Sequence, residues 1–336
     1  MALTMEEHMH FIAVIQPIGK RRKMKLTIIT LLLTFIAILA LDTGAVFAQG
    51  DKEAEKPQFR EESMRKFEVA NTAVQLNKGT MWVYNFGTIT LHAYETKDYF
   101  GTFVFILEKE GKAVLLESPP VRDNYEELID YIVGLGHTSI DLIVSYHPIG
   151  ATFIKTDKLK FTNVYSMQHA VDNYTTGPGA PSLIGLKNQF GELFDATIYK
   201  PTVMLKEGKK EIAGITFEMT NVDFAFDVAI PGMNIVHPHM LGHDKHTLVF
   251  SPEFLDAAIA QLKRYQEKGY DMIISSHAEP ETRGDVSIKL RYLQDLKVAI
   301  AESSNKDEFL AQMKAAYPGF GWPFYLQGSA NFLFVE

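Results

Sequence analysis

The pattern of apolar and polar positions predicts a run of short strands, followed by strands that alternate with helices. Four strand-like runs come first, at residues 81–84, 89–94, 102–107 and 113–116. The polar segment Glu108–Lys112 contains Gly111 and separates the last two runs, which predicts a β-hairpin. Apolar residues then recur at spacings of three and four between Asn124 and Leu135. This spacing predicts a helix directly after the hairpin.

Two fully apolar strands each follow a predicted helix and end on a histidine. The first strand covers residues 141–147, and the second covers residues 271–277 after a helix at 251–269. Two further helices are predicted at 285–301 and 306–316. Fully apolar strands indicate burial on both faces, so helices must cover the sheets, while the hairpins add antiparallel pairing. The sequence therefore predicts an α/β sandwich of mixed sheets flanked by helices.

The N-terminal segment has the pattern of an export signal. Basic residues at 20–25 precede an uncharged run at 26–41, and the small residues Val46 and Ala48 suit a cleavage site. We expect a signal peptide at 24–48, cleaved after Ala48, and a periplasmic or secreted protein. An uncleaved anchor is the alternative, because the run approaches the ~20 residues of a spanning helix. Residues 1–23 are interpreted as an upstream extension, which leaves Met1 and Met24 as alternative starts.

Composition narrows the classes of partner and of metal ligand. We expect a flexible leader at 49–65, which is charged and poor in apolar residues, and one folded domain at 66–336. Residues 1–48 hold five of the 33 basic and three of the 41 acidic residues, so the mature chain has 28 against 38 and a net charge of −10. This balance argues against nucleic acid as a partner. The chain has no cysteine, so any metal must bind to His, Asp or Glu.

A cluster of histidines lies between the two histidine-ended strands and adds candidate metal ligands. If Pro238 starts a helical turn, His239 and His243 share a face; if the segment is extended, His237 and His239 share one. Asp223 and Asp227 have the charge for metal binding, but their spacing equally suits capping or solvation of a loop. The candidate ligands are His147, His239, His243 and His277, with His237, Asp223 and Asp227 as lesser candidates. The expected ion is zinc or another divalent metal.

Three segments resemble the metallo-β-lactamase fold superfamily in their order along the chain. Glu117-Ser-Pro-Pro stands where that family has an acidic turn, Ser145-Tyr-His147-Pro-Ile-Gly-Ala151 resembles its Ser/Thr-His-x-His-x-Asp-His segment, and Ser276-His277-Ala-Glu-Pro280 resembles its Gly-His-Gly-x-Pro segment. The resemblance runs from about Val74 to the C-terminus. It implies an αββα sandwich of metallo-β-lactamase type, a zinc site and hydrolytic activity.

The family's metal-binding motif is not intact in this chain. Only His147 can be carried over from the histidine-rich loop, because Tyr146 and Pro148 occupy the ligand positions on either side of it. The resemblance therefore implies a remodelled or partly lost site, in which a single zinc activates water against an ester or amide. The alternative is a non-catalytic protein that binds a small molecule or a protein in the old cleft. The sequence leaves open whether the chain is an enzyme, and it does not indicate a substrate.

Overall fold

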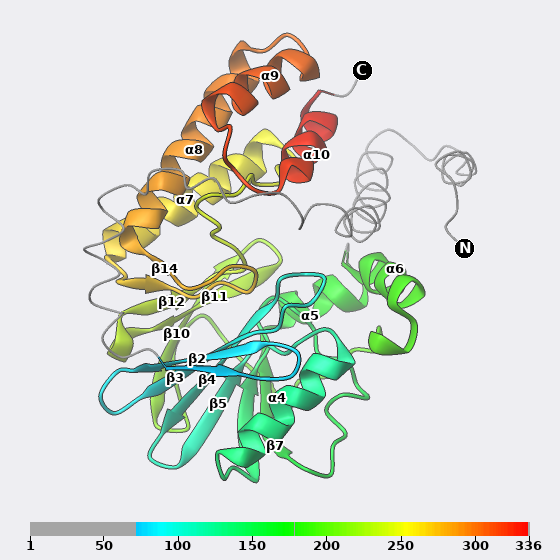
Figure 1. Cartoon of the computed structure of the whole chain (residues 1–336), viewed down its shortest axis with the longest axis vertical. Helices are drawn as coiled ribbons and strands as arrows, with labels where there is room; N and C mark the ends of the chain where they lie inside the picture. The colour runs from blue at the N-terminus through cyan, green and yellow to red at the C-terminus, as the bar shows by residue number, and fades with distance from the viewer. Residues whose placement is uncertain (1–71, 178, 335–336) are drawn as a thin grey trace.

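The computed structural model describes residues 72–177 and 179–334 (Figure 1). The predicted signal peptide at 24–48 and the leader at 49–65 lie outside these residues. None of the helices in the described part of the chain combines the length and the apolar character that crossing a membrane requires.

The first sheet has eight strands that lie side by side in chain order. They are β1 (Thr72–Gln75), β2 (Thr80–Asn85), β3 (Thr90–Glu95), β4 (Phe103–Lys109), β5 (Lys112–Leu116), β6 (Ser139–Ile143), β7 (Lys160–Ser166) and β8 (Val203–Met204). Pairing is antiparallel from β1 to β5 and parallel from β5 to β8. The predicted hairpin is confirmed as β4 and β5, and its turn needs Gly111 because φ is +73° there.

The second sheet has six strands in the order β14-β13-β12-β11-β10-β9. They are β9 (Gly208–Ile212), β10 (Ile215–Val222), β11 (Ala225–Ile230), β12 (Ile235–His237), β13 (Met272–Ile273) and β14 (Glu281–Thr282). Only β12 and β13 pair in parallel; the other neighbours are antiparallel. Both sheets are therefore mixed.

Helices flank the two sheets. They are α4 (Arg122–Gly134), α5 (Gln168–Thr175), α6 (Ala180–Phe190), α7 (Pro252–Lys268), α8 (Arg283–Glu302), α9 (Lys306–Ala316) and α10 (Pro323–Leu333), with short 3₁₀ turns η3 (Gly191–Leu193) and η4 (Pro231–Met233). Figure 1 shows α7, α8, α9 and α10 grouped on the side of the second sheet, whereas α4 lies against the first. Ser251 caps α7 by accepting from the N–H of Phe254, and Asn305 caps α9 through the N–H groups of Asp307 and Glu308.

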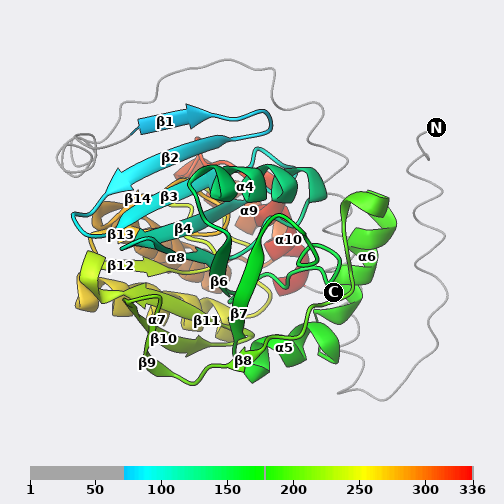
Figure 2. The ribbon, with the colours of Figure 1, turned by 90° about the horizontal axis from the view of Figure 1, so that it is seen from below.

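Alternation along the strands produces three cores and hence four layers. On β4, Phe105 and Leu107 face the second sheet and pack with Phe226 and other residues of β10 and β11, while Val104 and Ile106 face α4. A third core lies between the second sheet, α7, α8 and α9. Figure 2 shows the two sheets one above the other, with β2 to β4 above β10 to β12. The predicted αββα sandwich is confirmed.

The two histidine-ended strands are shorter than the apolar runs suggested. β6 ends at Ile143 and β13 ends at Ile273, so His147 and His277 each lie four residues beyond their strand. The apolar pattern continues because residues 144–146 and 274–276 remain buried at the sheet ends. Both histidines consequently lie on loops, where their orientation depends on contacts other than the strand ladder.

A buried leucine between the sheets should be far more costly to truncate than an exposed one. Leu107 is 0% exposed, and we expect Leu107→Ala to lower the free energy of unfolding by about 2–5 kcal/mol, because a cavity is left between two sheets. Leu135, which follows α4 and is 36% exposed, provides the matched control Leu135→Ala, with a loss below about 1 kcal/mol. Urea unfolding of both variants measures the difference. Equal losses would contradict the assignment of Leu107 to the core between the sheets.

Candidate metal centre

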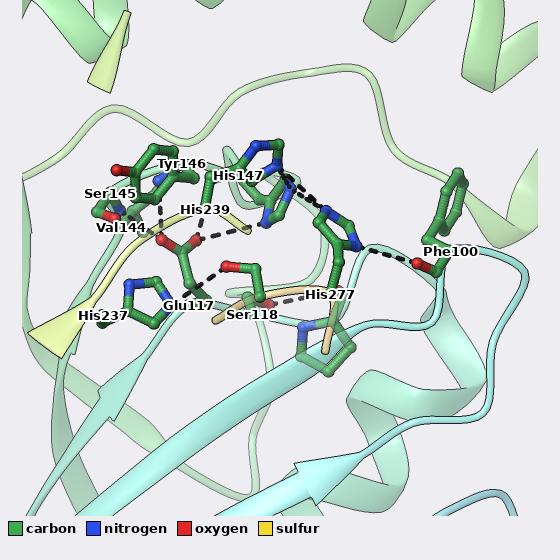
Figure 3. A network of polar contacts seen from close by, with 12 residues as sticks. Phe100, Glu117, Ser118, Val144, Ser145, Tyr146, His147, His237, His239 and His277 are labelled. Atoms are coloured by element: carbon green, nitrogen blue, oxygen red, sulfur yellow. Dashed lines mark hydrogen bonds and ion pairs between the residues drawn. The ribbon is translucent and has the colours of Figure 1, made fainter. Parts of the chain in front are cut away.

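Three histidines from three different loops bring their ring nitrogens together at one edge of the sandwich. His147 follows β6, His239 follows β12 and His277 follows β13. Nε2 of His147 lies 3.1 Å from Nε2 of His239 and 3.1 Å from Nε2 of His277, and the third side of the triangle is 3.2 Å. Figure 3 shows the three rings converging from separate segments. Among the described residues, this is the group of ligand atoms close enough to share an ion.

The hydrogen bond on the far side of His277 fixes which of its nitrogens is free. Nδ1 of His277 lies 3.0 Å from the carbonyl oxygen of Phe100, and a carbonyl can only accept. Nδ1 therefore carries the proton, and Nε2 of the neutral ring directs a lone pair toward His147 and His239. A ring that is oriented and polarised in this way through its second nitrogen is typical of a metal ligand.

The size and the charge state of the group fit a bound cation. Tetrahedral zinc with Zn–N bonds of ~2.0–2.1 Å places ligand nitrogens about 3.3–3.4 Å apart, close to the separations seen here. Burial lowers the pKa of His147, His239 and His277, and neighbouring imidazoles lower those of His147 and His239 further. All three rings are neutral at pH 7, which is the form that binds metal. The side chain of His147 keeps 21% of its surface exposed, so a ligand from solvent can reach the group.

Glu117 holds the loop that carries His147. Its carboxylate is fully buried and accepts backbone N–H groups from Ser145 and Tyr146 at Oε1, at 2.9 and 2.8 Å, and from His147 at Oε2, at 3.0 Å. Burial raises the pKa of Glu117, and the backbone N–H groups oppose that rise. Its nearer oxygen lies 3.9 Å from Nδ1 of His147, on the side of the ring away from the other two histidines. Glu117 is thus outside the group of three histidines, and it fixes the backbone that carries His147.

Tyr146 contacts the centre through its ring and its backbone. The phenol ring stacks on the imidazole of His239, with centroids 5.1 Å apart and planes at 16°. Its hydroxyl donates to Oδ1 of Asp227 at 2.5 Å. The sequence placed Tyr146 at a lost ligand position and assigned it no role; only the fold brings it against His239.

Asp227 belongs to the core of the second sheet. It lies on β11, is 2% exposed, and its carboxylate also receives hydrogen bonds from Tyr265, Gln261 and Arg264. Burial raises the pKa of Asp227, while the donors around it lower the pKa. The expectation that Asp227 caps or solvates a loop is therefore wrong. Asp223 is exposed in the turn between β10 and β11, and neither aspartate belongs to the histidine group.

His243 was a candidate ligand, and the structure places it elsewhere. Its Nδ1 lies 2.9 Å from Oε1 of Glu281 and 3.6 Å from Oδ1 of Asp285, and it is not part of the group of three. Burial lowers the pKa of His243, but the hydrogen bond to Glu281 and the charge of Asp285 outweigh this and raise it. The segment after Pro238 forms no helical turn, so the face shared by His239 and His243 does not exist.

His237 is buried beside the centre without joining it. It ends β12, is 0% exposed, and its Nε2 lies 3.1 Å from Oγ of Ser276. Its ring packs edge-on against Phe105, 5.7 Å between centroids. The strand ends at His237 and His239 lies in the bend that follows it, so the face that an extended segment would give to both is absent and only His239 reaches the other histidines.

Comparison with known proteins gives similarities at the level of fold. No protein-family model and no curated protein matches the sequence. The chain resembles a metallo-β-lactamase from Erythrobacter litoralis with 9% identity over 67% of this chain and 100% of that one, at a TM-score of 0.47. A stereoselective inverting sec-alkylsulfatase from Pseudomonas sp. has 13% identity over 72% of this chain, 49% of its own length and a TM-score of 0.48. A metallo-β-lactamase from Pontibacter korlensis has 14% identity to this chain. The match covers 67% of this chain and 99% of that one, with a TM-score of 0.38.

The architecture of the chain itself identifies its fold. Two mixed sheets face each other between helical layers, and loops from both sheets bring histidines to one edge. The chain has the metallo-β-lactamase fold. One of the three histidines comes from the loop after β6, and the other two come from loops of the second sheet.

The buried histidine beside the centre should make the stability of the metal-free protein depend on pH. Burial lowers the pKa of His237 to about 3, so as the pH falls below ~6.5 the unfolded chain takes up this proton before the folded chain does. Stability should fall by up to about 1.4 kcal/mol per pH unit in that window from this residue. Urea unfolding of His237→Gln between pH 7 and pH 5 should show a shallower slope than the parent. Identical slopes would contradict the burial of a neutral His237.

Proposed function

We propose that this chain is a metallohydrolase that uses one divalent ion, zinc in the first place, held by His147, His239 and His277. The observation that carries the proposal is the convergence of three Nε2 atoms within 3.2 Å of one another. Neutral imidazole nitrogens that converge on one point are the ligand atoms that a divalent cation takes, so a cation gives this arrangement its physical reason.

A single ion fits the group better than two. The histidine group contains no carboxylate and no fourth imidazole among the described residues. A second ion would need its own set of ligands at the same place. The carboxylate oxygens of Glu117 and Asp227 already accept hydrogen bonds from N–H and O–H donors. When bound by three histidines, zinc supplies Lewis acidity and a coordinated water whose pKa falls to ~7.

The chain's own residues orient and preserve the ligands. The carbonyl of Phe100 keeps the proton on Nδ1 of His277, so that Nε2 stays available at the centre. Glu117 fixes the backbone of the loop that presents His147. Asp98, whose charge acts on His277, adds negative potential beside this ring and favours a cation there. The reaction that suits such a centre is hydrolysis of an ester or an amide.

Removal of single histidines should separate ligands from bystanders. We expect about one zinc per chain in the purified protein, and loss of that zinc in His147→Ala, His239→Ala and His277→Ala, since each removes one of three ligands. His243→Ala is the matched control, because His243 lies on the same loop as His239 but outside the group, and it should keep its zinc. Elemental analysis measures the content.

The same proteins decide between a hydrolase and a binding protein. Turnover of 4-nitrophenyl acetate or a chromogenic amide should be lost with the zinc and kept in His243→Ala. A parent protein that holds zinc but hydrolyses neither substrate would point to the non-catalytic alternative. A parent protein that takes up no zinc would overturn the metal site itself.

Export is part of the proposal and is tested separately. The uncharged run at 26–41, its basic flank, and Val46 and Ala48 before Gln49 support cleavage after Ala48. Mass spectrometry of the protein recovered from outside the cytoplasm should give a mature N-terminus at Gln49. Recovery of the uncleaved chain in the membrane fraction would favour the anchor instead.

A further inference from the structure

Tyr146 has a hydrogen bond on each of its polar atoms, and all of them hold it beside the centre. Its backbone N–H donates to Glu117 at 2.8 Å, its carbonyl accepts from the hydroxyl of Tyr174 at 2.8 Å, and its own hydroxyl donates to Asp227 at 2.5 Å. The residue is 8% exposed. A side chain and backbone anchored at three points can transmit a fixed position to whatever they contact.

Tyr146 also contacts two of the three proposed ligands. Its ring lies nearly parallel to the imidazole of His239, at 5.1 Å and 16°, and its backbone continues directly into His147. His239 comes from the second sheet and His147 from the first, so Tyr146 adds a contact between the two loops beside the direct approach of the two imidazoles. A shift of the phenol would move one ligand by stacking and the other through the chain.

Asp227 anchors the phenol to the body of the protein. Oδ2 of Asp227 accepts from Tyr265 at 2.7 Å and from Arg264 at 2.6 Å, both on α7. Gln261, one turn earlier on α7, donates to both oxygens at 2.9 and 3.1 Å. The carboxylate is therefore fixed by a helix and a strand, and it presents Oδ1 to Tyr146. A buried charge with this many donors stays ionised only while they are in place.

We propose that Tyr146, held by Asp227, is a positioning residue that sets the geometry of His239 and His147 for the shared cation. The inference rests on the proposed function only in taking these histidines as ligands. It adds a component that the ligand set does not contain, namely a buried tyrosine in place of a ligand side chain, tied to a carboxylate on β11.

The decisive comparison uses two tyrosines that donate to the same carboxylate. Tyr146→Phe keeps the ring on His239 and removes the hydroxyl that donates to Oδ1 of Asp227. Tyr265→Phe removes a hydroxyl that donates to Oδ2 of the same carboxylate. Among the described residues, Tyr265 has no hydrogen bond to any of the three histidines. Both should lower the free energy of unfolding, since each leaves a buried acceptor short of a donor. Only Tyr146→Phe should weaken binding of Zn²⁺ alone, by roughly 10–100-fold, as expected for loss of a partner that orients a ligand.

Two readouts measure this effect without relying on turnover. Competition with a chromophoric chelator gives the Kd for Zn²⁺, and the visible spectrum of the Co²⁺ form reports the ligand geometry. We expect a changed Co²⁺ spectrum in Tyr146→Phe and a parental spectrum in Tyr265→Phe. Equal Zn²⁺ affinity and equal spectra in all three proteins would overturn the inference. So would equal losses of affinity in both variants, because that result would assign the effect to general destabilisation.

A double substitution tests whether Asp227 acts through Tyr146. Asp227→Asn should weaken Zn²⁺ binding in the parent, and it should add little further weakening in the Tyr146→Phe background, because the connection is already broken there. Additive losses would overturn the role given to Asp227. Weakened Zn²⁺ binding in Tyr146→Phe without any ester or amide turnover in the parent would keep this inference and reject the hydrolase. Normal turnover in the parent together with unchanged Zn²⁺ affinity in Tyr146→Phe would keep the hydrolase and reject this inference. A parent that binds neither Zn²⁺ nor Co²⁺ would reject both the hydrolase and this inference.

Discussion

The candidate site at the edge of the sandwich is defined by three imidazole nitrogens that meet within 3.2 Å. The three nitrogens come from three different loops, because His147 follows a strand of the first sheet and His239 and His277 follow strands of the second. The two sheets must therefore end at the same edge and stay in register. The backbone bond from Phe103 N–H to the carbonyl of Ser276, at 2.8 Å, joins the sheets next to His277. The apolar core between the sheets thus also sets the ligand geometry.

Two buried carboxylates secure the loop after β6 through different groups. Glu117 accepts its backbone N–H groups, whereas Asp227 accepts the hydroxyl of Tyr146. Each carboxylate would be costly to bury without donors, and each has at least three. The donors come from the loop itself for Glu117 and mainly from α7 for Asp227. The hydrogen bonds that replace water around the carboxylates of Glu117 and Asp227 thereby also keep the loop after β6 in one conformation.

Periodicity predicted the hairpin, the helices α4, α7, α8 and α9 and the sandwich, because these follow from apolar spacing that each segment carries by itself. It did not predict the strands β7 to β12 or the helices α5, α6 and α10, and it failed where a long-range partner decides the path of the chain. The choice between His239 and His243 does not follow from this spacing, because Glu281, 38 residues further on, binds His243 and its backbone. Asp227 did leave a signal: it is a lone charge within the otherwise apolar strand 225–230, and such a residue in a strand buried on both faces requires several donors.

A centre assembled from three loops places different demands on its surroundings than a loop that carries several ligands. When one loop supplies two imidazoles, its own backbone fixes their relative position. Here each loop supplies one imidazole, so every pair of ligands is related only through the tertiary structure. The contacts around the centre match this need: Phe100 orients His277, Glu117 fixes the backbone of His147, and Tyr146 bridges His147 and His239. Contacts from outside each loop thus do the work that a single loop backbone would do, and they hold the three imidazoles in one relative position.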